Sequence, residues 1–202
     1  MRPRKRRRSE SFIPPPQTSS APLPSSKTIS SSPATRNTPI KCNRDQFMAS
    51  LLQTLLSNNP EQTKAIGKIL ARSLRPGNSI GLTGELGAGK TQFVKGLAMG
   101  LGIDEDEVVS PSFGLINEYA GDKKLYHVDL YRLDTAEDIE TLGLTDYIFG
   151  DGICVIEWAD RLGGDLSLLD IHIQIEILPD NRRRLRFSGK DLAAFEEAAK
   201  SL

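Results

Sequence analysis

Residues 84–91 have the residue types and the spacing of a loop that holds phosphate groups. Their sequence, Gly-Glu-Leu-Gly-Ala-Gly-Lys-Thr, matches the pattern Gly-x-x-x-x-Gly-Lys-[Ser/Thr] at every fixed position. The glycines allow a tight turn that aims backbone N–H groups inward, and the N-terminus of the following helix also attracts an anion. In such loops the lysine, here Lys90, reaches the β- and γ-phosphates, and the hydroxyl, here of Thr91, ligates magnesium. The pattern therefore predicts a site for a nucleoside triphosphate and Mg²⁺.

Two acidic residues stand at the ends of apolar, strand-like segments. Residues 125–129 end in Asp129, and residues 153–157 end in Glu157. The carboxyl ends of parallel strands face the ligand crevice of an α/β domain, so both carboxylates are expected near the loop. One would hold magnesium, usually through water, and the other would orient or deprotonate the attacking water. The alternative for either acid is a salt-bridged residue at a strand end, and the sequence does not decide which acid activates water.

Segments typical of several classes of phosphate-loop protein are missing. The chain has no Asn-Lys-x-Asp segment for guanine and no Leu-Ser-Gly-Gly-Gln transporter signature, and it is short for a helicase motor. ATP is therefore the expected nucleotide. A small-molecule kinase would need a lid with several arginines, and the tight cluster at 182–184 falls in an expected hairpin turn. A solvated basic tip or a local RNA contact explains that cluster, and the kinase is kept as the alternative function.

The elements needed to position these residues form an alternating series. The cap Asn59 and the first-turn Pro60 indicate a helix start, and Pro179-Asp180-Asn181 indicates a hairpin turn. The alternation predicts an α/β domain of the P-loop NTPase type, a layered fold with a mostly parallel central sheet and an antiparallel C-terminal hairpin. The expected strands are 79–83, 114–119, 125–131, 153–158, 171–178 and 184–187, and the expected helices are 60–74, 90–101, 136–141 and 191–199.

The N-terminal part differs from the rest in composition. Residues 1–41 carry nine Lys and Arg and one acid, and residues 9–39 hold nine Ser and seven Pro. We expect residues 1–46 to be a disordered tail, because such a segment buries too little apolar surface to offset its ordering entropy, and residues 47–202 to be one P-loop ATPase domain. A start at Met48, a transit peptide and an RNA tether are the other interpretations of the tail. The remaining 17 basic and 25 acidic residues give the folded part no global preference for nucleic acid.

No apolar run approaches the roughly 20 residues that cross a bilayer, and the chain begins without the apolar segment of a secretory signal. We therefore expect no membrane association and a cytoplasmic location, with an organelle matrix as the alternative. Cys42 and Cys154 are interpreted as free thiols in a reducing compartment.

Taken together, these segments resemble the TsaE family (formerly the YjeE family), the ATPases needed to form threonylcarbamoyl-adenosine in bacterial tRNA. The resemblance covers about residues 57–188, and its motifs stand in the family's order: Thr63 and Gly67 on the first helix, the loop at 84–91, a switch segment at 109–113 with 116–119, His-Val-Asp-Leu-Tyr-Arg-Leu at 127–133, and Ile-Glu-Trp-Ala-Asp-Arg-Leu at 156–162. Ser112 stands where the family usually has Thr, which keeps the hydroxyl. Val109 stands where a polar residue is frequent and receives no role.

The resemblance implies a role for each matching position. It places Thr63 near the adenine, Glu85, Leu86, Gly87, Ala88, Gly89 and Lys90 around the phosphates, Thr91 and Glu157 on Mg²⁺, Trp158 near the nucleotide, and Ser112 as a sensor of the γ-phosphate. Lys90, Asp129 and Glu157 would be the catalytic residues. Core packing is the alternative for Trp158. His127 is either a site residue or a satisfied strand histidine, and His172 is expected to be structural.

The same resemblance implies a switch ATPase rather than the modifying enzyme itself. Its partners would be the two subunits, of the TsaB and TsaD type, of the complex that transfers the threonylcarbamoyl group, so tRNA would be an indirect partner. The γ-phosphate would order the segment 109–113, and hydrolysis would release it. The scarcity of arginines able to act as a finger predicts weak ATPase activity without the partner. An ATP-gated scaffold that never hydrolyses is the non-enzymatic alternative.

Overall fold

The computed structural model describes residues 53–112, 115–133, 136–163 and 166–202. The expected tail at 1–46 lies outside these residues, as do Cys42 and Met48. Phe113 and Gly114, at the end of the switch segment and the start of an expected strand, also lie outside them.

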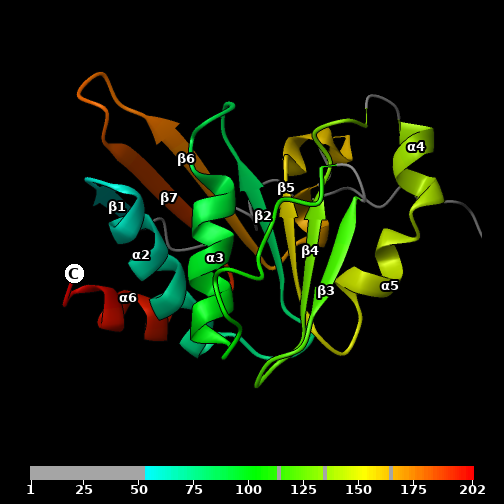
Figure 1. Ribbon diagram of the computed structural model, residues 1–202, viewed down its shortest axis with the longest axis horizontal. Coiled ribbons are helices and arrows are strands. Elements are labelled where there is room, and N and C mark those ends of the chain that lie inside the picture. The colour runs from blue at the N-terminus through cyan, green and yellow to red at the C-terminus, as the bar shows by residue number, and fades with distance from the viewer. Residues whose placement is uncertain (1–52, 113–114, 134–135, 164–165) are drawn as a thin grey trace, which may run out of the picture. The chain divides into compact units, whose positions relative to one another are not determined.

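A seven-stranded sheet forms the centre of this part of the chain (Figure 1), with the strand order β1-β7-β6-β2-β5-β4-β3. The four central strands β6, β2, β5 and β4 pair in parallel, and the three outer pairs are antiparallel. The strands are β1 (Gln53–Ser57), β2 (Ser79–Thr83), β3 (Ile116–Tyr119), β4 (Leu125–Asp129), β5 (Ile153–Glu157), β6 (Ile171–Ile177) and β7 (Arg183–Gly189). The expected α/β fold, with a parallel core and an antiparallel C-terminal hairpin, is confirmed.

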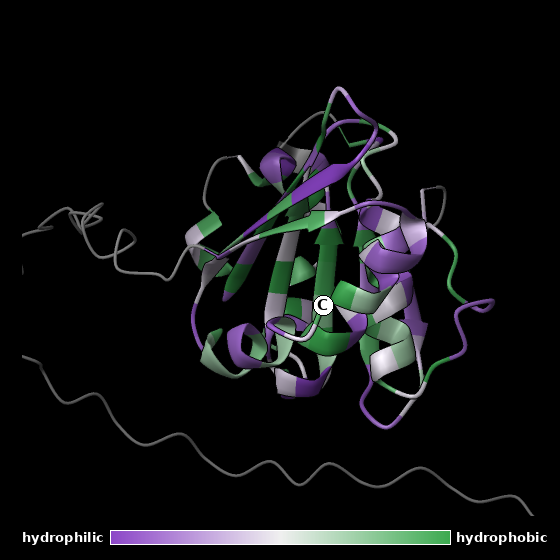
Figure 2. Cartoon of the chain, turned by 90° about the vertical axis from the view of Figure 1, so that its left-hand side faces the viewer, coloured by the Kyte–Doolittle hydropathy of each residue, from purple (hydrophilic) through white to green (hydrophobic). Residues whose placement is uncertain are grey.

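Helices cover both faces of the sheet, so the central strands β4 and β5 are buried along their whole length, as is typical of parallel sheets. Ile153 and Val155 pack into one core with α2 (Pro60–Ser73), α3 (Lys90–Gly100) and α6 (Ala193–Ala199). Cys154 and Ile156 point to the other face and pack under α4 (Ala136–Thr141), α5 (Leu144–Ile148) and the 3-10 turn η1 (Ala159–Leu162). Figure 2 shows the hydrophobic residues concentrated in the central strands.

Helix α2 starts where the sequence predicts. The side chain of Asn59 accepts a hydrogen bond from the backbone N–H of Gln62 at 2.8 Å, and Pro60 takes the first helical position, where no N–H is needed. Helix α3 then packs unusually close to α2 through two glycines. A Cβ atom at Gly67 would lie 2.5 Å from the carbonyl oxygen of Phe93, and one at Gly96 would lie 2.1 Å from that of Lys64. Helix α2 therefore fixes the position of the helix that follows the phosphate loop.

One strand and one α-helix were not predicted. Strand β1 is too weakly patterned to be seen locally, and it forms because it pairs with β7, more than 100 residues away, from Gln53 opposite Phe187 to Ser57 opposite Arg183. Helix α5 has five residues and follows Gly143, whose left-handed φ of 61° separates it from α4. The predicted strands 125–131 and 153–158 end earlier, at Asp129 and Glu157.

In the four described ranges no helix is long and apolar enough to cross a membrane.

The contact between α2 and α3 can be tested at Gly96. Replacing Gly96 with Ala should destabilise the protein by about 1–3 kcal/mol, because the added methyl group meets a backbone carbonyl that cannot rotate away. In a helix without this contact the same change would stabilise by roughly 1 kcal/mol, so the sign of the shift is diagnostic. Thermal and denaturant unfolding measure it, and an unchanged or raised midpoint would contradict the close approach.

Candidate functional site

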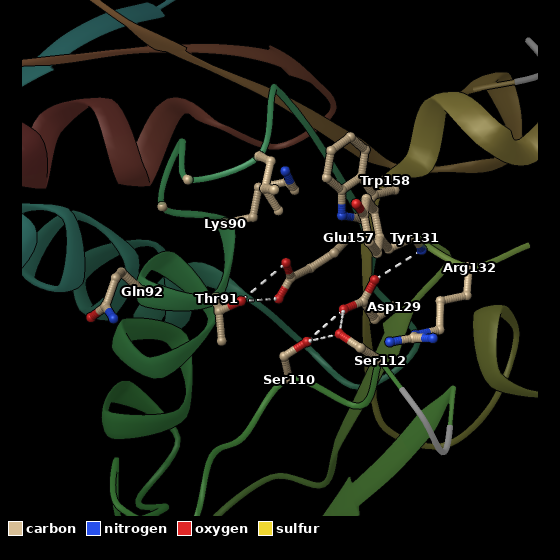
Figure 3. A pocket seen from close by; sticks show the side chains of 13 residues that line it. Lys90, Thr91, Gln92, Ser110, Ser112, Asp129, Tyr131, Arg132, Glu157 and Trp158 are labelled. Atoms are coloured by element: carbon tan, nitrogen blue, oxygen red, sulfur yellow. Dashed lines mark hydrogen bonds between the residues drawn. The ribbon is translucent and has the colours of Figure 1, made fainter.

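A cavity of about 480 Å³ lies at the carboxyl ends of β2, β4 and β5, beside the start of α3 (Figure 3). Nine of the residues expected at the site line it: Leu86, Gly87, Gly89, Lys90, Thr91, Ser112, Asp129, Glu157 and Trp158. Four further lining residues, Gln92, Ser110, Tyr131 and Arg132, had been given no role. The elements thus bring most of the predicted residues into one concave site.

The loop at 84–91 adopts a conformation that its glycines allow. Gly84, Gly87 and Gly89 have φ values of 142°, 80° and 104°, a region that residues with a Cβ rarely adopt. At Gly84 a Cβ atom would also lie 2.2 Å from the carbonyl oxygen of Ile175 on β6. Helix α3 then begins at Lys90 with no side-chain cap on its first turn. The first backbone N–H groups of α3 are therefore not satisfied by a capping side chain, which suits the binding of an anion.

The ammonium group of Lys90 is held by the loop itself. Its Nζ donates to the carbonyl oxygens of Gly84 at 2.7 Å and Glu85 at 3.0 Å, and it lies 3.6 Å from the ring centroid of Trp158. Burial lowers the pKa of Lys90, while the nearby carboxylates of Glu157 and Asp129 act in the opposite direction. The loop thus places a cation beside the cavity before any phosphate is present.

Thr91 and Glu157 form the pair expected to hold magnesium. The Thr91 hydroxyl donates to both carboxylate oxygens of Glu157, at 2.8 and 3.2 Å, and Glu157 is only 3% exposed. Hydroxyl and carboxylate oxygens suit Mg²⁺, which keeps several waters and is usually bound by few protein groups together with substrate phosphates. Among the described residues no cluster of three or more His, Cys, Asp or Glu could hold a metal ion. The donor set fits a magnesium ion shared with phosphate.

Asp129 is the centre of a second group of hydrogen bonds (Figure 3). Its Oδ2 accepts from Ser110 Oγ at 2.5 Å and from Ser112 Oγ at 2.8 Å, and the two hydroxyls are 2.6 Å apart. Its Oδ1 accepts from the backbone N–H of Tyr131 at 2.9 Å. Both oxygens of this buried carboxylate are therefore engaged, and two of the three donors come from the switch segment.

The four lining residues without an assigned role had recognisable signals. Gln92 directly follows the loop, Ser110 is in the switch segment beside Ser112, and Tyr131 and Arg132 belong to the signature at 127–133. The position of Arg132 corrects the expectation that the domain has few arginines near its nucleotide site. Because an arginine of this chain lines the cavity, the scarcity of arginines no longer supports weak activity without a partner.

Three expected residues do not line the cavity. Thr63 is buried, and its hydroxyl lies 2.7 Å from that of Ser57, so its contact with adenine stays a prediction. Ala88 is buried in the core below the loop. Glu85 lines a second cavity of about 470 Å³ on the other side of the loop, together with His172. His172 Nε2 lies 3.0 Å from the Thr83 hydroxyl, and burial lowers the pKa of this histidine.

The arginine cluster of the hairpin is largely paired within the fold. Arg182 bonds Asp180 at 2.6 Å, and Arg184 bonds Glu176 at 3.0 Å. Arg183 donates to the carbonyl oxygen of Gly87 at 3.4 Å, which connects the hairpin to the phosphate loop. The cluster therefore lies at the surface, where its members pair within the hairpin and with the phosphate loop.

Comparison with known proteins supports a single family. Residues 57–185 match the family described as "Threonylcarbamoyl adenosine biosynthesis protein TsaE". The tRNA threonylcarbamoyladenosine biosynthesis protein TsaE of Treponema pallidum is 42% identical over 130 residues, which is 64% of this chain and 96% of that protein. The protein of the same name from Bacillus subtilis is 44% identical over 132 residues, 65% of this chain and 82% of that protein.

A solved structure is also similar. The crystal structure of Bacillus subtilis YdiB matches with a TM-score of 0.60 and 34% identity, and the match covers 75% of this chain and 97% of that one. The family match spans the phosphate loop, the switch segment and both strand-end acids, so it covers the whole cavity described above. The chain belongs to the TsaE family of threonylcarbamoyladenosine biosynthesis proteins.

Proposed function

We propose that the protein is an ATP-binding switch that acts in the threonylcarbamoyladenosine modification of tRNA. In this proposal it hydrolyses ATP weakly and acts on a transferase complex with subunits of the TsaB and TsaD type. The observation that carries the proposal is a single cavity that combines the phosphate loop, the Thr91–Glu157 pair and Asp129, in a chain of the TsaE family. Trp158, which lines the cavity against Lys90, would lie near the nucleotide.

The phosphates of ATP would bind where Lys90 and the uncapped start of α3 converge. Thr91 and Glu157 would hold Mg²⁺, which shields the phosphate charge when bound. A phosphate oxygen is a strong hydrogen-bond acceptor, so it competes with the loop carbonyls for Lys90 and with Asp129 for the hydroxyl of Ser112. Ser112 is the residue through which the segment 109–112 would respond to a γ-phosphate.

The same competition explains why hydrolysis would be weak in the isolated protein. Ser110 and Ser112 both donate to Oδ2 of Asp129, so this oxygen becomes free to accept a hydrogen bond from a water molecule when they release it. A partner that draws the switch segment away would free this oxygen. Two apolar side chains beside the cavity suit such a contact, since Leu86 is 71% exposed and Val109 is 59% exposed.

Lys90 provides the first test of the nucleotide site. Replacing Lys90 with Ala should weaken ATP binding roughly 10- to 100-fold, because a hydrogen bond to a charged group contributes about 1.5–3 kcal/mol. Titration calorimetry measures the change. Lys95→Ala on the same helix is the matched control, since Lys95 does not line the cavity. Equal affinity in both variants would mean that ATP does not use this loop.

Asp129 provides the test of hydrolysis. Replacing Asp129 with Asn should lower single-turnover phosphate release about 10²- to 10⁴-fold, the usual contribution of a general base, while ATP affinity stays within about threefold. The exposed Asp106 gives the control Asp106→Asn, which should hydrolyse ATP like the wild type. If Asp129→Asn hydrolyses at the wild-type rate, Asp129 is not the base.

The pathway is tested in cells depleted of the protein. Nucleoside mass spectrometry of total tRNA should show a loss of threonylcarbamoyladenosine that wild-type protein restores and Lys90→Ala does not. Restoration by Lys90→Ala would separate the pathway role from the ATP site. An unchanged level of the modified nucleoside would overturn the pathway assignment, and transfer of label from ATP to a small acceptor would then be the next measurement.

A further inference from the structure

His127 is a buried titratable residue to which the mechanism above gives no task. It lies in the middle of β4, is fully buried, and does not line the cavity. Its Nε2 lies 2.9 Å from Oε1 of Glu157, behind the face of that carboxylate that meets Thr91. His127 is thus close enough to act on the site only through Glu157.

The surroundings of the imidazole show which ring nitrogen bonds Glu157. A carboxylate accepts hydrogen bonds and cannot donate them, so the hydrogen of the short contact sits on Nε2 of His127. The other ring nitrogen, Nδ1, is buried and has no hydrogen-bond partner in the described part of the chain. The contact with Glu157 is therefore the one hydrogen bond that the ring makes within the described part of the chain.

Glu157 is consequently held from two sides. Oε1 accepts from Thr91 Oγ1 at 2.8 Å on the cavity side and from His127 Nε2 at 2.9 Å on the sheet side. The two donors differ in where they lie. A hydroxyl keeps lone pairs for an ion while its O–H donates, so Thr91 can ligate the ion and stay bonded to Glu157 at the cavity. His127 is fully buried and does not line the cavity, so its bond holds the carboxylate from the side that the ion does not reach.

We propose that His127 is a positioning residue that fixes the orientation of Glu157 for Mg²⁺. The inference rests on the proposed function, because it presumes that Glu157 helps to hold the ion. Groups that hydrogen-bond to a metal ligand typically change metal affinity about 10- to 100-fold when they are removed. A histidine that only filled space in the sheet would change stability and would leave the magnesium dependence unaltered.

Four variants separate these two roles. His127→Leu removes the donor, and His127→Asn keeps an amide that is too short to reach Glu157. His127→Gln places an amide nitrogen at about the reach of Nε2 and should restore the bond. His172→Leu is the matched control, because His172 is the only other histidine of the chain, lies on β6, which β2 and β5 separate from β4, and contacts Thr83 rather than Glu157.

The readout is binding, followed by the fluorescence of Trp158, the single tryptophan of the chain and part of the cavity wall. ATP is titrated in excess EDTA, and Mg²⁺ is then titrated at saturating ATP. In His127→Leu and His127→Asn the Mg²⁺ midpoint should rise about 10-fold or more, while ATP affinity in EDTA changes less than about twofold. His127→Gln and His172→Leu should keep the midpoint within about threefold of the wild type.

Several outcomes would overturn the inference. An unchanged Mg²⁺ midpoint in His127→Asn would show that the bond does not position Glu157. A parallel loss of ATP affinity in EDTA would point to general damage to the fold, and thermal unfolding would show it directly. Failure of His127→Gln to recover would mean that packing, not the donated hydrogen bond, matters. If wild-type protein binds no ATP, the proposed function itself fails. This result is distinguishable from a failure of the inference, because it is seen in the wild type without any change at His127.

Discussion

The parallel hydrogen bonding of β2, β5 and β4 is the constraint on which the site depends. It pairs Glu157 with Leu82 on one side and with Asp129 on the other, so both acids end their strands beside the loop that leaves β2. A shift of one residue would turn a strand's side chains to the opposite face. The apolar residues that alternate into the two cores prevent such a shift. The chemistry of the cavity is therefore positioned by buried side chains that never contact a ligand.

A second layer of support comes from backbone contacts that only glycine allows. Gly67 and Gly96 bring α2 and α3 into direct contact, and Gly84 brings the phosphate loop against the backbone of Ile175 on β6. The loop is thus held by a helix on one side and by the hairpin on the other, with Arg183 adding a hydrogen bond to Gly87. Lys90 is oriented by this rigid surrounding and does not depend on phosphate for its placement.

Much of this arrangement could be predicted from local sequence. The phosphate loop, the buried strands and the cap Asn59 each carry their signal within a few residues, and the acids Asp129 and Glu157 end strands that were recognisable as apolar runs. Strand β1 could not be predicted, because it depends on pairing with β7. The bonds from Ser110 to Asp129 and from His127 to Glu157 were equally hidden, since each joins residues 19 or more positions apart. Thr63, expected near the adenine, lies buried with Ser57, a contact that becomes visible only once β1 is placed.

The buried thiol of β5 has a consequence for how the site responds to oxidants and to labelling reagents. Cys154 lies three residues before Glu157, and burial raises the pKa of its thiol to about 12. Very little reactive thiolate is therefore present at neutral pH, and the side chain is enclosed by apolar neighbours. The strand that carries Glu157 is thus chemically silent toward peroxide and alkylating agents. A cysteine introduced at the exposed Val109 could accept a spectroscopic label and report on the switch segment without competition from this strand.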